Sequence, residues 1–279
     1  MDKLFALLRL VRPLNDLLVF ASVLLGAVMA TGPTISWSVL LAGLSAALIS
    51  AGGYGLNDFC DVEIDRINRA ERPIPSGKVS PKEALYLSVA LMLLGISLAL
   101  WIGPSALVVA LFAALGLLLY DFRLKHIPFW GNLLVSALCA LTFMYGGLAA
   151  RDIRASLIPG MFALLFHFGR EIVKDVEDIQ GDAAFKSRTI PVDFGPEFSF
   201  RMATMVYLIL MGLTFLPFFA GIYNGYYLII AVVGVDLPLI YVLLSMWKDR
   251  SRSNLRRLNG MLKGGMAAGL VAILAGKGW

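Results

Sequence analysis

Long apolar segments separated by short polar links dominate the chain. A transmembrane helix needs about 20 predominantly apolar residues, and nine segments approach or exceed that length. They lie at about 14–31, 36–56, 84–102, 104–120, 127–149, 155–173, 199–219, 225–247 and 258–276. The pattern predicts an all-α integral membrane protein. We expect nine transmembrane helices to bundle around a central cavity in one membrane-embedded domain, residues 1–279.

The charged residues are unevenly divided between the links. Links after the second, fourth, sixth and eighth segments carry most of the charge, and 21 of the 24 Lys and Arg residues fall on that side, together with the N-terminus. The other side holds only Arg151, Arg154 and Lys277. Cytoplasmic loops of membrane proteins are enriched in Lys and Arg. We therefore expect a multi-pass protein of the cell membrane with a cytoplasmic N-terminus and the charged links on the cytoplasmic side.

Composition narrows the class of protein further. Of the 279 residues, 59% are hydrophobic and 15% are charged, whereas a soluble domain carries about 25% charged residues. These values exclude a disordered chain and a typical nucleic-acid binder. Cys60 and Cys139 lie far apart and form neither a disulfide framework nor a metal-binding pair.

The acidic residues gather in two short segments, each after an even-numbered apolar stretch. The first reads Asn57-Asp-Phe-Cys-Asp-Val-Glu-Ile-Asp65, and the second reads Glu171-Ile-Val-Lys-Asp-Val-Glu-Asp-Ile-Gln-Gly-Asp182. A helix turns by about 100° per residue, which aligns the polar residues of each segment on one face. The first face holds Asn57, Asp58, Asp61 and Asp65, and the second holds Glu171, Asp175, Asp178 and Asp182.

Such stacking has a physical cost. Like charges four residues apart repel one another on a helix, so two stacked acidic faces indicate a cation between them. Carboxylates suit hard cations, and Mg2+ is the usual choice when a substrate supplies phosphate oxygens. If both faces meet at one cavity, they can hold a diphosphate and stabilise it as it leaves. We therefore predict a diphosphate-using enzyme with an Mg2+ cofactor, in preference to two patches of surface ion pairs.

The two segments match the patterns N-D-x-x-D-x-x-x-D and D-x-x-D-x-x-x-D in full. With these motifs and nine spans, the whole chain resembles the UbiA superfamily of intramembrane prenyltransferases. Three further segments are similar to the branch that makes archaeal ether lipids: Arg72-Pro-Ile-Pro-Ser-Gly77, Pro128-Phe-Trp-Gly-Asn132 and Arg170-Glu-Ile-Val-Lys-Asp175. The resemblance implies transfer of a geranylgeranyl group from an isoprenyl diphosphate donor to a lipophilic acceptor. The acceptor that the resemblance implies is geranylgeranylglyceryl phosphate, through its free hydroxyl.

The resemblance also implies roles for individual residues. The expected metal ligands are Asn57, Asp61, Asp65, Asp175, Asp178 and Asp182, and the expected catalytic residues are Asp61, Asp65, Asp175, Asp178 and Lys125. Substrate contacts are expected from Arg12, Asn15, Asp58, Arg72, Lys78, Tyr120, Arg123, Glu171 and Lys174. The segment Tyr120-Asp-Phe-Arg-Leu-Lys125 is one residue longer than the family's common Y-x-x-x-K form. The sequence therefore leaves open whether Arg123 or Lys125 reaches the diphosphate.

Other functions remain as alternatives. The same fold with a quinone precursor, a chlorin or haem as acceptor would carry the same motifs. A cation transporter is less favoured, because transport acids usually lie near the bilayer midplane. A CDP-alcohol phosphotransferase needs a glycine directly after its second aspartate, where this chain has Val62. Asp236 interrupts the eighth apolar segment, and we expect it to face the interior with a structural hydrogen bond.

Overall fold

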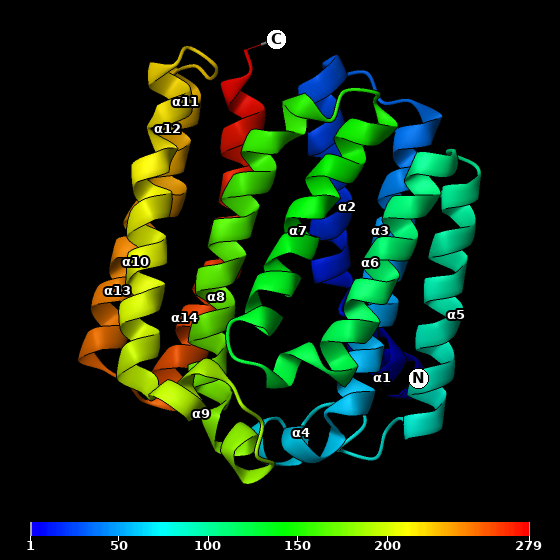
Figure 1. The fold of residues 1–279 in the computed structure, drawn as a ribbon, viewed down its shortest axis with the longest axis vertical. Coiled ribbons are helices and arrows are strands. Elements are labelled where there is room, and N and C mark those ends of the chain that lie inside the picture. The colour runs from blue at the N-terminus through cyan, green and yellow to red at the C-terminus, as the bar shows by residue number, and fades with distance from the viewer. Residues whose placement is uncertain (1, 279) are drawn as a thin grey trace.

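Helices joined by short links make up the computed structural model, which describes residues 2–278 and has no strand in that range (Figure 1). The membrane-crossing helices and their extensions are α1 (Asp2–Val11), α2 (Pro13–Thr31), α3 (Trp37–Cys60), α5 (Pro81–Leu100), α6 (Pro104–Phe122), α7 (Trp130–Ala149), α8 (Leu157–Ala184), α10 (Pro196–Thr214), α11 (Leu216–Phe219), α12 (Gly225–Ala231), α13 (Leu237–Lys248) and α14 (Arg252–Gly276). Shorter elements are α4 (Val62–Asn68), η1 (Leu124–His126), η2 (Arg154–Ser156), α9 (Ile190–Phe194) and the π-helical turn η3 (Val232–Asp236).

Nine helical segments within residues 2–278 are long and apolar enough to cross a membrane, which confirms the predicted number. The largest differences from the predicted bounds are at charged helix ends. The sixth span was expected to end at 173, but α8 continues to Ala184, and the ninth begins at Arg252 instead of 258. Hydropathy marks where a helix leaves the apolar layer, whereas backbone hydrogen bonding carries the helix on into the polar region.

The charged links gather at one end of the bundle. Figure 1 shows α1, α4 and α9 at this end, and α14 starts there and runs to the opposite end. The chain therefore begins and finishes its membrane crossings on opposite sides, as an odd number of spans requires.

Glycines let the helices around the cavity approach one another closely. A Cβ atom on Gly146 of α7 would overlap the backbone carbonyl of Val23 in α2, and a Cβ on Gly26 of α2 would overlap the carbonyl of Phe143 in α7. Small residues at helix contacts allow close backbone packing, which supplies much of the association energy between helices in lipid. These two glycines therefore allow α2 and α7 to pack in direct backbone contact.

The outer side of α8 is fixed by an apolar core. Ile172 and Val173 are fully buried in a cluster with Phe200 of α10, Leu239 of α13 and Leu258 of α14. Because this face of α8 is buried against three helices, its acidic face is held toward α3 and α4.

Asp236 lies in the π-helical turn η3 and is 5% exposed. It accepts a hydrogen bond from Thr214 Oγ1 at 3.3 Å. The prediction of an interior-facing acid with a structural partner is confirmed.

We expect Gly146→Ala to lower the thermal unfolding midpoint in detergent, because overpacking at a tight contact costs about 1–3 kcal/mol. Gly212→Ala in α10 is the matched control, since a Cβ there meets no atom within 4 Å. It should leave the midpoint unchanged or raise it, given alanine's better helix propensity. Equal midpoints for the two variants would contradict the close-contact role of Gly146.

Candidate functional site

The two acidic motifs lie on helices that an asparagine holds together. The backbone of α3 continues into α4 through Asp61, whose N–H donates to the Asn57 carbonyl at 2.9 Å. At the end of α4, the Asn68 side chain donates to the Asp178 carbonyl at 2.9 Å and accepts from the Gly181 N–H at 3.2 Å. A Cβ on Gly181 would overlap the Asn68 amide. The spacing between the motifs is therefore set by this contact between α4 and α8.

A small cavity of about 60 Å³ lies between the motifs. It is lined by all six residues predicted to hold metal: Asn57, Asp61, Asp65, Asp175, Asp178 and Asp182. Glu63 lies on the exposed face of α4, paired with Arg66, as the helical geometry predicted. The alignment of each motif on one helix face thus brings the two acidic faces together.

Basic side chains neutralise this cavity. Lys125 Nζ lies 2.5 Å from Asp61 Oδ1, Arg72 Nη1 lies 2.5 Å from Asp65 Oδ2, and Arg69 Nη2 lies 2.9 Å from Asp178 Oδ2. These three cations come from two different links and surround the same space. An anionic group that enters the cavity therefore meets cations as well as carboxylates.

The remaining two acids of the cavity are held by neutral donors. Asp175 accepts from Asn132 Nδ2 at 2.7 Å, and Asp182 accepts from Thr189 Oγ1 at 3.4 Å. Asn132 is the last residue of the Pro128-Phe-Trp-Gly-Asn132 segment, so the structure gives that segment a contact with the second motif.

Burial affects the ionisation of Asp65, which is 3% exposed. Burial raises the pKa of Asp65 to about 6, although the ion pair with Arg72 lowers it. Nearby Asp58 raises it further. A carboxylate in this state is stabilised by any further cation brought close to it.

The oxygen donors of the cavity fit a hard divalent cation. Aspartate and amide oxygens are ligands that Mg2+ accepts, and Asp178 Oδ1 is buried without a hydrogen-bond partner among residues 2–278. Within the described chain, three of the five carboxylates are held in ion pairs and the other two by neutral donors. No three acidic, histidine or cysteine side chains there converge closely enough to hold an ion. Bringing metal to the site therefore requires the cations to exchange carboxylate partners for another anion.

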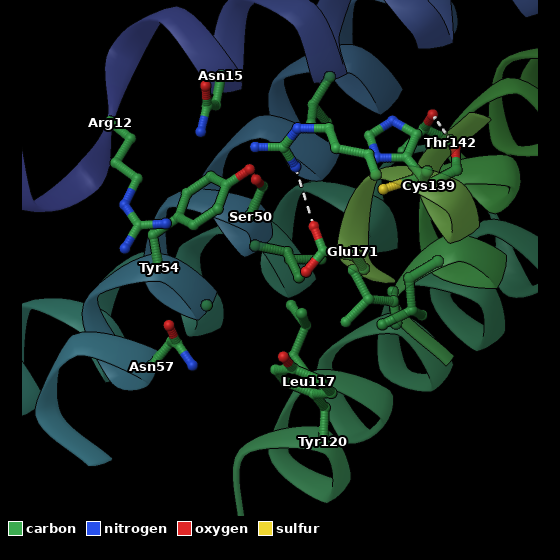
Figure 2. Close-up of a pocket in the computed structure, with 18 of the residues that line it drawn as sticks. Arg12, Asn15, Ser50, Tyr54, Asn57, Leu117, Tyr120, Cys139, Thr142 and Glu171 are labelled. Carbon is green, nitrogen blue, oxygen red and sulfur yellow. Dashed lines mark hydrogen bonds and ion pairs between the residues drawn. The ribbon is translucent and has the colours of Figure 1, made fainter. Parts of the chain in front are cut away.

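A larger cavity of about 430 Å³ joins the motif cavity. Five residues line both spaces: Asn57, Arg69, Arg72, Tyr120 and Lys174. Figure 2 shows Tyr54 and Asn57 on one wall, with Tyr120 and Glu171 across from them. The remaining walls of the larger cavity are formed by mostly apolar residues of α3, α6 and α7. Such walls suit a hydrocarbon chain.

Most of the predicted substrate residues lie in these cavities. Arg12, Asn15, Arg72, Tyr120, Glu171 and Lys174 all line the larger one. Arg12 has a left-handed backbone conformation at the junction of α1 and α2, with φ of 55°. Its guanidinium lies over the Tyr54 ring, 4.7 Å from the ring centroid.

Three of the predicted substrate residues are elsewhere. The side chains of Arg123 and Lys78 are exposed and line neither cavity. Lys125 lines the motif cavity because the turn η1 directs it back toward Asp61.

Asp58 is the third, and it lies behind the cavity wall with 1% exposure. Its Oδ1 accepts from Arg12 at 2.5 Å and from Arg72 at 2.9 Å. Asp58 lines neither cavity in this structure and instead holds the two arginines that line the larger one.

Four residues at the site were missed from the sequence: Asn68, Arg69, Asp121 and Asn132. Arg69 is four residues beyond Asp65, so helix periodicity placed it on the same face. Asn132 ends the segment Pro128-Phe-Trp-Gly-Asn132, so its sequence context already marked it. Asp121, which accepts from Asn57 Nδ2 at 2.8 Å, and Asn68 act through contacts between distant helices, which no local pattern reveals.

The fold and the site together define a class. A helical membrane protein with two facing acidic motifs, basic side chains between them and an adjoining apolar cavity has the architecture of an enzyme for lipid diphosphates. The model of the UbiA prenyltransferase family matches residues 19–264. This chain belongs to that family and is a prenyltransferase.

Particular relatives are also similar over nearly the whole chain. A digeranylgeranylglyceryl phosphate synthase from Methanosphaera stadtmanae is 34% identical, covering 96% of this chain and 98% of the relative. A solved structure of digeranylgeranylglyceryl phosphate synthase is 32% identical with a TM-score of 0.75 and covers 99% of both chains. A UbiA homologue from Archaeoglobus fulgidus, solved with GPP and Mg2+, has a TM-score of 0.67 at 20% identity, covering 96% of this chain and 99% of that one. The last match supports the fold alone.

We expect Asp58→Asn to destabilise the protein by about 3 kcal/mol or more, because breaking a buried ion pair leaves uncompensated charge. The measurement is the thermal unfolding midpoint in detergent. Glu63→Gln makes the same change of charge on the exposed face of α4, where an ion pair is worth at most about 1 kcal/mol. If Asp58→Asn is as stable as Glu63→Gln, then Asp58 does not hold the arginines in the way described.

Proposed function

We propose that this protein transfers a geranylgeranyl group from geranylgeranyl diphosphate to the hydroxyl of geranylgeranylglyceryl phosphate, with Mg2+ as cofactor. The product has the second ether bond of an archaeal-type membrane lipid. The observation that carries the proposal is the meeting of six motif residues in one cavity that opens onto a large apolar cavity. The names of the relatives supply the donor and acceptor.

The motif residues would hold the metal through Asn57, Asp61 and Asp65 on one side and Asp175, Asp178 and Asp182 on the other. Mg2+, when bound, supplies Lewis-acid stabilisation of the diphosphate's negative charge. Lys125, Arg72 and Arg69 lie at the same cavity and donate to phosphate oxygens once they release their carboxylates. These charge-assisted hydrogen bonds strengthen as the leaving group gains charge.

The larger cavity favours the transfer by excluding water. The bond between the donor's first carbon and the diphosphate oxygen breaks, and its electron pair leaves with the diphosphate. The apolar walls from α3, α6 and α7 shield the resulting allylic cation from hydrolysis. The acceptor's hydroxyl oxygen then bonds to that carbon and loses its proton.

We also infer that the active site faces the cytoplasm. The motifs lie at the end of the bundle that carries most of the Lys and Arg residues, and such residues concentrate on the cytoplasmic side.

The direct test is transfer by the purified protein. Labelled geranylgeranyl diphosphate, geranylgeranylglyceryl phosphate and Mg2+ should give digeranylgeranylglyceryl phosphate by mass spectrometry, and a chelator should abolish the product. Asp61→Asn and Asp178→Asn should each reduce kcat by about 100-fold or more. Preferred use of a quinone precursor or chlorin would overturn the acceptor, and near-normal turnover in both variants would overturn the site.

Lys125→Met should reduce kcat/KM for the donor by about 100-fold, because a preorganised cation at the leaving group is lost. Arg123→Met should stay within about twofold, since exposed substitutions away from a site have small effects. Steady-state kinetics with varied donor separate the two. The reverse order of effects would assign the diphosphate contact to Arg123.

A further inference from the structure

A second cavity adjoins the larger one, and a pair of basic residues lies where they meet. This cavity measures about 150 Å³ and lies among α2, α7, α8, α10, α12 and α14. Its walls are mainly apolar, with Phe143, Phe166 and Leu210 among them. Arg170 and Lys263 line both cavities, and no acidic residue does so.

These two basic groups are incompletely paired. Arg170 Nη1 donates to Glu171 Oε1 at 2.9 Å, but Arg170 Nε is buried and has no hydrogen-bond partner within residues 2–278. Lys263 has neither an ion pair nor a hydrogen bond in the described chain. Lys174 also depends on Glu171, with its Nζ 2.8 Å from Oε2. Three cations therefore accompany one carboxylate, an excess of two positive charges.

The other cations of the larger cavity are ion-paired, and its other carboxylates have ion-pair or hydrogen-bond partners. Glu177 is held by Arg69, Arg256 and Asn259, while Arg12 and Arg72 share Asp58. Asp121 accepts from Asn57. The positive excess is thus local to Arg170, Lys174 and Lys263. Lys263 lies on a membrane-spanning helix and is exposed toward the cavities that it lines. Ionisable residues within membrane-spanning segments mark functional sites.

The charge and the shape indicate one kind of ligand. A phosphate monoester carries up to two negative charges near neutral pH, which matches the local excess. Under the proposed function, the donor's diphosphate binds at the motif cavity, so it does not need this second group of cations. In a prenylated glycerol phosphate, hydroxyl and phosphate are attached to the same three-carbon glycerol, so a phosphate subsite must lie close to the reacting carbon. Lys174 lines both the motif cavity and the larger cavity, which gives the required proximity.

We propose that Arg170 and Lys263 bind the phosphate monoester of the acceptor and that the acceptor's prenyl chain occupies the cavity lined by Phe143, Phe166 and Leu210. The donor's prenyl chain then lies in the other apolar region, beside α3 and α6. This inference rests on the proposed function for the identity of the acceptor. It adds a separate anion site and gives each of the two prenyl chains its own cavity.

Kinetics of Lys263→Met provide the first test. The KM for geranylgeranylglyceryl phosphate should rise by about tenfold or more, as expected for loss of a charge-assisted contact, while the KM for geranylgeranyl diphosphate stays within about twofold. Lys263→Arg should restore most of the acceptor affinity. Arg257→Met removes another exposed cation from the same helix, α14, one that lines none of the three cavities, and should change neither constant. An unchanged acceptor KM in Lys263→Met, with an active wild type, overturns the subsite and leaves the proposed function standing.

Binding provides a test that does not depend on turnover. Geranylgeranylglyceryl phosphate should raise the unfolding midpoint of the wild type more than unphosphorylated geranylgeranylglycerol does, and Lys263→Met should lose that difference. If the wild type shows no transfer, the proposed function fails, and this phosphate-dependent difference still decides the subsite. Phosphatidic acid tests whether the site instead binds the headgroup of a bulk lipid. If Lys263→Met abolishes the stabilisation by phosphatidic acid but keeps the stabilisation by geranylgeranylglyceryl phosphate, the proposal is overturned.

Gly269→Leu tests the position of the acceptor chain. Gly269 lines the second cavity, and a Cβ there meets its nearest atom, on Val235, at 3.9 Å, so a larger side chain extends into open space. The variant should prefer farnesylglyceryl phosphate over the longer acceptor and keep its donor KM. A shift in donor chain preference instead would reverse the assignment of the two cavities.

Discussion

Burial of several carboxylates at the edge of a membrane is possible only if each one has a partner, and the whole site follows from this constraint. An unpaired buried charge is strongly destabilising. Arg72 therefore bridges Asp58 and Asp65 within the first motif, and Arg69 reaches across to Asp178 and Glu177 of α8. The same ion pairs that neutralise the acids also hold α4 against α8. The ion pairs therefore both stabilise the buried acids and set the position of α4 relative to α8.

Under the proposed function, this arrangement would let one cavity accept both a metal ion and a diphosphate. A divalent cation brings positive charge to the carboxylates, and a diphosphate brings negative charge to Lys125, Arg69 and Arg72. The two ligands together exchange partners with groups already in place, so neither set of side chains is left unpaired. The Oδ1 of Asp178 is buried without a hydrogen-bond partner within residues 2–278, so it requires no such exchange.

Helical periodicity accounts for what the sequence could predict. It separated Asp61 and Asp65 from Glu63, and it aligned the acids of α8, because both motifs are on helices where spacing determines direction. It could not position Arg123 and Lys125, which lie at a helix end and a short turn where no regular period applies. Asp58 shares the general direction of the other acids, but its depth behind Arg12 and Arg72 depends on how α1 and the link after α4 fold back. Asn68 and Gly181 meet only because two distant helices pack, and no local pattern contains that information.

The apolar part of the bundle sets the limits of the chemistry. Paired glycines bring α2 and α7 into backbone contact, and residues of both helices line both apolar cavities. Under the proposed function, the donor's first carbon must meet the glycerol hydroxyl of the acceptor, so the two prenyl chains need separate paths to one point. The two cavities offer such paths, and the basic residues Arg170 and Lys263 line both of them. A single wide cavity would hold the same volume of lipid, but it would not fix which chain presents its hydroxyl to the cation and which presents its diphosphate to the acids.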